Sequence, residues 1–262
     1  MDLIQDSYIS YVNLTHREDR LTHMRSQLER IGLRAIRQQG FPWIETDHMN
    51  PKYLTMKNRT PGAIGCFLSQ MEIMKKALDV HAHAWVMEDD LVFCQDFNER
   101  IKNMGDFLEG REWDILWLGG TFHTPAFWHP VGQSKMPPDC SAQLGKDCET
   151  TDDPRMIRTY AAFCTYAYIV NRDSIQKVLD MLEGDISTSI GIDYSMIRMQ
   201  PKLNCFAYVP GSVKQIDNQS DIGSGMTIFS GFSRLNGTEE NSRYWYQDYA
   251  MDFDPTTFNF NK

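Results

Sequence analysis

The feature that most constrains this chain is a short apolar run that passes without a gap into three acids. The run covers residues 84–87, and the acids are Glu88, Asp89 and Asp90. Three adjacent carboxylates repel one another, so placing them at the end of a buried strand costs stability unless a cation lies there. Ligands of open α/β sheets bind outside the carboxyl ends of the strands. We therefore expect a buried strand that delivers acids to a binding site.

The spacing within this triplet indicates which acids act together. Side chains two apart on an extended chain point the same way, so Glu88 and Asp90 can face one ligand. Hard divalent cations such as Mg²⁺ or Mn²⁺ prefer oxygen ligands and are often shared with substrate phosphates. The competing interpretation is a solvated acidic turn, because charge runs are usually solvated faces. From these residues alone, both interpretations stay open.

The first half of the chain alternates strand and helix patterns. Strands are expected at 8–14, 33–37, 84–87 and 113–118, where apolar, β-branched or aromatic residues gather. Helices are expected at 21–31, which Gly32 ends, from Thr60-Pro61 onward, and at 97–108. This alternation indicates a mostly parallel, Rossmann-like sheet.

The second half begins with an irregular stretch. Residues 119–156 show no sustained period, and a loop of that length in a compact domain is usually a functional lid or a mobile segment. Regular patterns then return as a strand at 158–170, helices at 174–182 and 191–198, and a strand at 203–209. We expect one domain over 1–222, with a polar and aromatic extension, 223–262, that wraps it.

Composition narrows the function. The chain has 262 residues, 42% of them hydrophobic, which is ample for a packed core and excludes wholesale disorder. Its formal net charge of -9 argues against a nucleic-acid groove or an anionic membrane face. No apolar run approaches the roughly 20 residues that span a bilayer, and the N-terminus lacks the pattern of a signal peptide. We expect a soluble protein, cytoplasmic unless an upstream targeting segment has been removed.

Several short sequence blocks follow one another along the chain. They are Tyr11-Val12-Asn13-Leu14 with Arg17 and Arg20, Gly65-Cys66-Phe67-Leu68-Ser69, Met87 to Phe93, Trp113 to Gly119, Ala167 to Val170, Ile192-Asp193, and Gln215 with Ser220-Asp221-Ile222. Taken together, in this order and spacing from residue 8 to about 222, the blocks resemble the glycosyltransferases of family 25, which include bacterial lipooligosaccharide galactosyltransferases and procollagen galactosyltransferases.

This resemblance implies a GT-A-type fold, which is a Rossmann-like mixed sheet flanked by helices in a single domain with a long central loop. It also implies an inverting transfer of a hexose from a UDP-sugar to an acceptor hydroxyl on a glycan or protein. Galactose is favoured, glucose is possible, and Mn²⁺ or Mg²⁺ is the expected cofactor. Two departures leave donor and acceptor identity open. Gln70 stands where family members usually have histidine, and residues 121–156 match no family motif.

The same resemblance assigns candidate roles. Glu88 and Asp90 are the expected metal ligands, and Asp193 is the expected general base. The expected donor-binding residues are Asn13, Arg17, Arg20, Gly65, Ser69, Asp89, Gln215 and Asp221. Each role competes with a plainer one: exposed first-turn charges for the arginines, helix packing for Gly65 and Ser69, a surface cap for Asp193, and a solvated turn for Gln215 and Asp221.

Four histidines have more than one interpretation. His123 and His129 share the long loop with Phe122, Phe127 and Trp128, and they are candidates for acceptor contacts or for packing of a lid. His81 and His83 alternate before the acidic strand and are interpreted as turn residues.

Two other kinds of function remain open at this point. One is a non-catalytic protein of the same fold that binds a sugar nucleotide or glycan, or that mediates adhesion. The other is a glycoside hydrolase that places two carboxylates across a glycosidic bond and needs neither nucleotide nor metal. Nucleotide binding and metal-dependent turnover of a donor separate these alternatives from a transferase.

Overall fold

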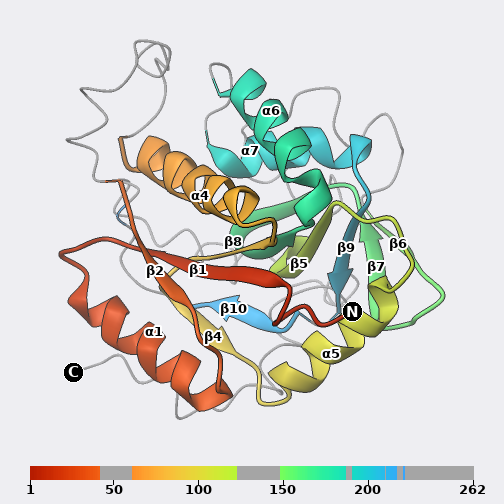
Figure 1. The fold of residues 1–262 in the computed structure, drawn as a ribbon, viewed down its shortest axis with the longest axis horizontal. Helices are drawn as coiled ribbons and strands as arrows, with labels where there is room; N and C mark the ends of the chain where they lie inside the picture. Colours follow the sequence, from red (N-terminus) through yellow and green to blue (C-terminus); the bar gives the residue numbers. More distant parts are fainter. Residues whose placement is uncertain (42–60, 123–147, 187–190, 210, 217–220, 222–262) are drawn as a thin grey trace, which may run out of the picture.

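The computed structural model describes residues 1–41, 61–122, 148–186, 191–209, 211–216 and 221. A mixed eight-stranded sheet forms its centre, with strand order β2-β1-β3-β8-β5-β9-β7-β6 (Figure 1). In that order, the strands are Ile36–Gln39, Ser7–Asn13, His83–Met87, Ala162–Val170, Ile115–Phe122, Cys205–Tyr208, Met156–Thr159 and Cys148–Thr150.

Helices cover both faces of this sheet. Figure 1 shows α4 (Pro61–Asp79), α6 (Ile175–Asp185) and α7 (Ile192–Met199) above it, and α1 (Glu18–Ile31) and α5 (Phe97–Leu108) below it. Two short 3-10 turns, Arg172–Ser174 and Gln200–Lys202, precede α6 and follow α7. The architecture is therefore a three-layer α/β domain.

Strand alternation divides the core between the two faces. In β3, Trp85 and Met87 join the apolar cluster under α1 and α5, whereas Ala84 and Val86 join the cluster under α4, α6 and α7. All five residues of β3 are buried, which is why this strand reads as a continuous apolar run. Because β3 lies inside the sheet, its acidic continuation emerges from the middle of the molecule.

A second, two-stranded sheet lies beside the acids. β4 (Leu91–Phe93) follows Asp90 directly and pairs antiparallel with β10 (Val213–Gln215), with Gln215 opposite Leu91. The amide of Ile216 donates to the carbonyl of Asp90 at 2.9 Å, which extends the pairing to the acidic turn. The C-terminal part of the domain is thereby fixed next to the end of β3.

The mixed sheet, the flanking helices and the single domain confirm the expected fold class. The expected helix stop is also confirmed, because Gly32 adopts the left-handed conformation with φ of 68°. The expectation of a mostly parallel sheet was wrong. Within the described sheet three of the seven neighbouring pairs are parallel and four are antiparallel, because β8 lies antiparallel between β3 and β5 and β7 lies antiparallel between β9 and β6.

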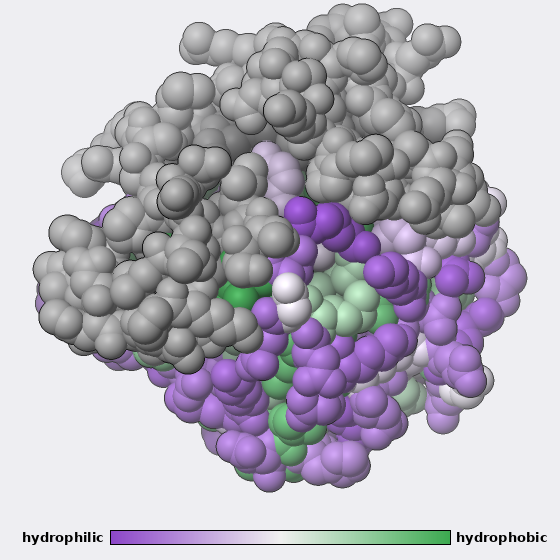
Figure 2. All heavy atoms as spheres, turned by 90° about the horizontal axis from the view of Figure 1, so that it is seen from above, coloured by the Kyte–Doolittle hydropathy of each residue, from purple (hydrophilic) through white to green (hydrophobic). Residues whose placement is uncertain are grey.

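Two further boundaries differ from the sequence prediction. The strand expected at 158–170 is two strands, β7 and β8, and the expected irregular stretch 119–156 is shorter, since β5 continues to Phe122 and β6 starts at Cys148. The extension 223–262 lies outside the described residues. Hydrophilic residues cover most of the coloured surface in Figure 2, with smaller hydrophobic areas between them. Within the described ranges, no helix combines the length and apolar composition needed to cross a membrane.

Candidate active site

The acids of the triplet meet Gln215 at the carboxyl end of β3. The side-chain amide nitrogen of Gln215 donates to Glu88 Oε2 at 2.9 Å and to Asp90 Oδ2 at 3.1 Å. The two carboxylates that the two-residue spacing was expected to align therefore converge on one point. Because β10 pairs with β4, Gln215 becomes the third residue of this cluster.

Burial makes the charges of this cluster costly. Asp90 is 3% exposed, and its Oδ1 has no hydrogen-bond partner among the residues that the structure describes. Burial raises the pKa of Asp90 to about 6, although Arg20 acts in the opposite direction. Burial, together with the charges of Asp90 and Asp193, raises the pKa of Glu88 well above its ordinary value. Ionising a buried carboxylate oxygen without a hydrogen-bond partner is costly, and a neighbouring cation would stabilise the charge.

Asp89 contacts the end of β1 and the first turn of α1. Asn13 Nδ2 donates to its Oδ2 at 2.6 Å, and Arg20 Nη1 donates to its Oδ1 at 2.9 Å. The same Arg20 nitrogen lies 3.3 Å from Asp90 Oδ2. Asn13 and Asp89 are buried, so the first strand, the first helix and the acidic turn are tied together by hydrogen bonds between these side chains.

Arg17 is held by acids on both sides. Its guanidinium forms a two-point ion pair with Asp19, at 3.0 and 2.9 Å, and a second ion pair with Asp221. His16 Nε2 lies 3.4 Å from the other oxygen of Asp221. The structure thus brings Asp221 to the start of α1, where it contacts Arg17. Both residues were expected to bind the donor.

Gly65 and Ser69 lie on one side of α4 and contact the chain just after β2. A Cβ at Gly65 would overlap the carbonyl oxygen of Phe41. Ser69 Oγ accepts from the amide of Phe41 at 2.9 Å and donates to the carbonyl of Gly65 at 2.6 Å. Packing against Phe41 accounts for both residue types, and a role in donor binding stays a prediction.

Asp193 begins α7 and is anchored to β8. The amide and the hydroxyl of Thr165 donate to Asp193 Oδ1 at 2.7 and 3.0 Å. The preceding residue, Cys164, has φ of 70°, which is uncommon for a residue other than glycine, and the pairing of β8 with β5 shifts register here. This irregular turn of β8 aims the Thr165 donors at Asp193. Burial raises the pKa of the Asp193 carboxyl.

A network behind the acids was not identified from the sequence as functional. Gln70, at the position noted as a departure from the family pattern, accepts from Tyr168 Oη at 2.8 Å. Its amide nitrogen faces the Thr165 carbonyl at 3.2 Å and Glu88 Oε1 at 3.4 Å. Gln70 and Tyr168 are both fully buried. A polar residue within the apolar face of α4 was the signal that could have identified it, since buried polar groups are retained with partners.

The structure describes two of the four histidines considered above. His123 and His129 lie outside the described residues, as do Phe127 and Trp128. His83 is the first residue of β3 and is buried, which corrects its interpretation as a turn residue. Its Nδ1 accepts from the amide of Arg172 at 2.9 Å. His81 is exposed in the turn before β3, as expected.

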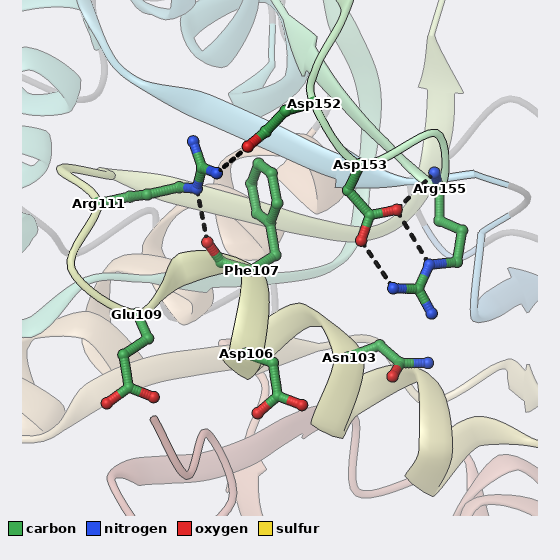
Figure 3. A pocket seen from close by; sticks show the side chains of 8 residues that line it. All are labelled: Asn103, Asp106, Phe107, Glu109, Arg111, Asp152, Asp153 and Arg155. Atoms are coloured by element: carbon green, nitrogen blue, oxygen red, sulfur yellow. Dashed lines mark hydrogen bonds and ion pairs between the residues drawn. The ribbon is translucent and has the colours of Figure 1, made fainter.

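A hollow of about 330 Å³ lies elsewhere, beside the end of α5 (Figure 3). It is lined by Asn103, Asp106, Phe107, Glu109, Arg111, Asp152, Asp153 and Arg155. Figure 3 shows its arginines already paired, Arg111 with Asp152 and Arg155 with Asp153. None of the acids at the end of β3 lines this hollow, so it is separate from the candidate active site.

Fold and site together define an α/β domain that presents acids at the carboxyl end of a central strand, β3. A sequence model described as "Glycosyltransferase family 25 (LPS biosynthesis protein)" matches residues 6–196. The chain therefore belongs to glycosyltransferase family 25, and a sugar-nucleotide donor and an acceptor follow from that membership. Among solved structures, the chain is similar to mouse xyloside xylosyltransferase 1 in its apo form, with 9% identity and a TM-score of 0.41 over 75% of this chain and 82% of that one.

Proposed function

We propose that this glycosyltransferase moves a hexose from a UDP-sugar to an acceptor hydroxyl on a glycan or protein, with inversion at the anomeric carbon and with Mn²⁺ or Mg²⁺ as cofactor. Galactose is the favoured sugar and glucose the second candidate. The observation that carries the proposal is the convergence of Glu88 and Asp90 on one point, with Asp90 Oδ1 buried and without a partner in the described structure.

The donor set suits a hard cation that arrives with a diphosphate. Among the described residues, no group of three acids, histidines or cysteines lies close enough to hold a metal without help. Mg²⁺ and similar ions are commonly bound through one or two carboxylates together with substrate phosphates. Glu88 and Asp90 would supply the carboxylates, and Gln215 carries an amide oxygen of the kind that such ions accept. When bound, the cation supplies positive charge that stabilises the leaving diphosphate.

The residues around β1 and α1 support donor binding. Asn13 and Arg20 are positioned by Asp89 at the carboxyl end of β1, next to the metal acids. Arg17 carries the charge and geometry to pair with phosphate, and its ion pair with Asp221 is the contact that a phosphate would replace. The donor would therefore lie over the ends of β1 and β3, where ligands of α/β sheets bind.

Asp193 is the proposed general base. Its charge contributes to raising the Glu88 pKa, which supports a role for Asp193 near the proposed metal ligands. Thr165 holds its carboxyl group in one orientation. In the proposed step, Asp193 takes the acceptor hydroxyl proton while that oxygen attacks the anomeric carbon. The anomeric bond to the diphosphate breaks, and its electron pair leaves with UDP. A pKa raised by burial favours this role, because a base works best when its pKa lies near the working pH.

A donor screen tests the proposal. Wild-type protein is incubated with UDP-galactose or UDP-glucose, Mn²⁺ and a panel of sugar acceptors, with and without a chelator, and UDP release is measured. We expect release that the chelator abolishes and that Mn²⁺ restores. Donor binding without any turnover would instead support a non-catalytic binding protein, and turnover unaffected by the chelator would contradict the metal-dependent site.

The base is tested separately by Asp193→Asn, which keeps an oxygen to accept from Thr165. We expect transfer to fall by roughly a hundredfold or more while the affinity for the UDP-sugar changes little, because the base acts on the acceptor and not on the donor. Calorimetry and steady-state kinetics measure the two effects. Weakened donor binding with normal turnover at saturation would make Asp193 a donor ligand.

A further inference from the structure

Gln70 occupies a buried position between three elements that carry the proposed chemistry. It projects from α4 and is fully buried, as is its partner Tyr168 on β8. Its amide oxygen accepts from Tyr168 Oη at 2.8 Å. Its amide nitrogen lies 3.2 Å from the Thr165 carbonyl and 3.4 Å from Glu88 Oε1. One side chain therefore contacts the acidic turn and the strand that anchors Asp193.

Tyr168 fixes which way this amide faces. The Tyr168 hydroxyl is buried, and burial raises its pKa well above the ordinary value, so it keeps its proton and donates. In the opposite orientation, the amide oxygen of Gln70 would face a carbonyl oxygen and a carboxylate oxygen, and all three are acceptors. The amide nitrogen, which carries two hydrogens, can instead serve both acceptors. The Tyr168 hydroxyl thus selects the orientation that holds Glu88 and Thr165.

The two partners of the Gln70 amide nitrogen connect it to the residues proposed to act on the leaving group and on the acceptor. Glu88 lies on the leaving-group side, since it accepts a hydrogen bond from Gln215 and is a proposed ligand of the cation. Thr165 leads to the acceptor side, because its amide and hydroxyl donate to Asp193. The irregular backbone at Cys164 directs the amide and hydroxyl of Thr165 toward Asp193. The hydrogen bond from Gln70 to the Thr165 carbonyl holds this backbone in place. The backbone adds a second tie, since the amide of Glu88 donates to the Tyr166 carbonyl at 2.8 Å.

We propose that Gln70, oriented by Tyr168, is a positioning residue that sets the distance between Glu88 and Asp193 and so aligns the leaving group with the base. This proposal rests on the proposed function. Gln70 acts through Glu88 and Thr165 and touches no substrate. Its loss therefore affects turnover more than donor affinity, which depends on Asn13, Arg17 and Arg20.

The experiment compares Gln70→Met, Tyr168→Phe and the double variant with wild type, by measuring kcat and the donor KM with saturating Mn²⁺. Gln70→Met keeps the size of the side chain and removes its hydrogen bonds. We expect kcat to fall roughly tenfold to a hundredfold, as misplacement of reacting groups does, and the donor KM to stay within about threefold. Tyr168→Phe should lower kcat less. The double variant should match Gln70→Met alone, because Tyr168 acts through Gln70.

Two further variants separate positioning from general stability. Gln70→His, at about pH 8 where histidine is neutral, offers one accepting and one donating nitrogen and should recover most of kcat. Gln27→Met is the matched control, because Gln27 is a buried glutamine whose contacts are with Arg30 and the Phe93 amide. It should lower the melting temperature and leave kcat within about twofold of wild type.

Three results would overturn the proposal. A kcat for Gln70→Met within about twofold of wild type would do so, as would a double variant that multiplies the two single losses. If Gln70→Met does not fold, Tyr168→Phe, which removes one hydroxyl, decides with the same threshold on kcat. A wild-type protein that releases no UDP from any donor would remove the proposed function as well, so that failure is distinguishable from a failure of the positioning role alone.

Discussion

Glu88, Asp89 and Asp90 are neighbours in sequence, but their surroundings give them different roles. Both oxygens of Asp89 accept hydrogen bonds, from Asn13 and Arg20, so its charge is compensated within the protein. Asp90 Oδ1 has no such partner in the described structure, and burial raises the Asp90 pKa to about 6. The first environment stabilises a carboxylate, and the second leaves it in need of a cation. Adjacent substitutions should therefore have opposite effects on stability.

Asp90→Asn should raise the stability of the metal-free protein and abolish transfer. Because the folded-state pKa is raised, the stability that this group contributes is present below about pH 4 and is lost as the pH rises through about 6. Removing the charge should therefore stabilise the protein at about pH 8, by roughly 1 to 3 kcal/mol, and give roughly a third of that gain at about pH 4.5. Thermal unfolding at both pH values measures the gain. Transfer within about tenfold of wild type would show that Asp90 does not hold the metal.

Asp89→Asn should destabilise the protein. The replacement removes a buried ion pair with Arg20, so a loss of roughly 1 to 3 kcal/mol in the free energy of unfolding is expected. Chemical denaturation at about pH 8, run beside Asp90→Asn, measures it. A variant as stable as wild type would mean that Asp89 does not hold the loop between β1 and α1.

At the scale of elements, β10 determines whether the site is complete, because it carries Gln215 to the acids. β10 packs across the middle of β5, where the amide of Ser212 donates to the Leu118 carbonyl at 2.7 Å. Gly119 makes this approach possible. A Cβ there would overlap the Val213 carbonyl oxygen and approach the Tyr166 ring to 2.7 Å. The glycine in the middle of β5 is therefore required by the backbone of β10.

Gly119→Ala should displace β10 and weaken the site. Overpacking of this kind costs roughly 1 to 3 kcal/mol, and the shift should also reduce metal-dependent transfer because Gln215 moves with β10. Gly184→Ala is the matched control, since Gly184 lies in α6 with no atom within 4 Å of an added Cβ. That change should stabilise the helix by roughly 0.5 to 1 kcal/mol. If both variants unfold at the same temperature, close packing of β10 is not a constraint.

The elements that the sequence predicts well are those with a strong local signal. The helix before Gly32 has apolar residues every three or four positions, and the strand that precedes Glu88 is a continuous apolar run. β4 and β10 were not predicted, because three residues are too few to show a period, and their pairing joins segments far apart in the chain. The register irregularity at Cys164 has no sequence signal either. It depends on packing between β8, β5 and α7.

The same distinction applies to the site. Glu88 and Asp90 could be recognised because the acids lie together beside a strand, and the structure brings both side chains to Gln215 although residues 89 and 90 form a bend and not an extended strand. The roles of Asp89 and Gln70 could not be predicted from local pattern, since each depends on partners from distant segments. Asp193 could be selected as an acid at a helix start, but its link to Thr165 appears only in the fold.

At the scale of the whole molecule, the balance of charge supports the proposed cation. The chain has a formal net charge of -9, and a UDP-sugar is itself an anion. Binding the donor beside Glu88 and Asp90 would add repulsion to a cluster whose pKa values are already raised by burial and by neighbouring acids. Arg17 and Arg20 offset part of this repulsion, but both are engaged by aspartates. A divalent cation shared between the carboxylates and the diphosphate removes the conflict.

Calorimetry of UDP binding with and without Mn²⁺ therefore tests the central claim most directly. If Glu88, Asp90 and the diphosphate share one cation, UDP should bind at least roughly tenfold more tightly when Mn²⁺ is present, a coupling of about 1.4 kcal/mol or more. By reciprocity, Mn²⁺ should bind more tightly when UDP is present, and Asp90→Asn should abolish both effects. Equal UDP affinity with and without the metal would contradict a shared cation site at the end of β3.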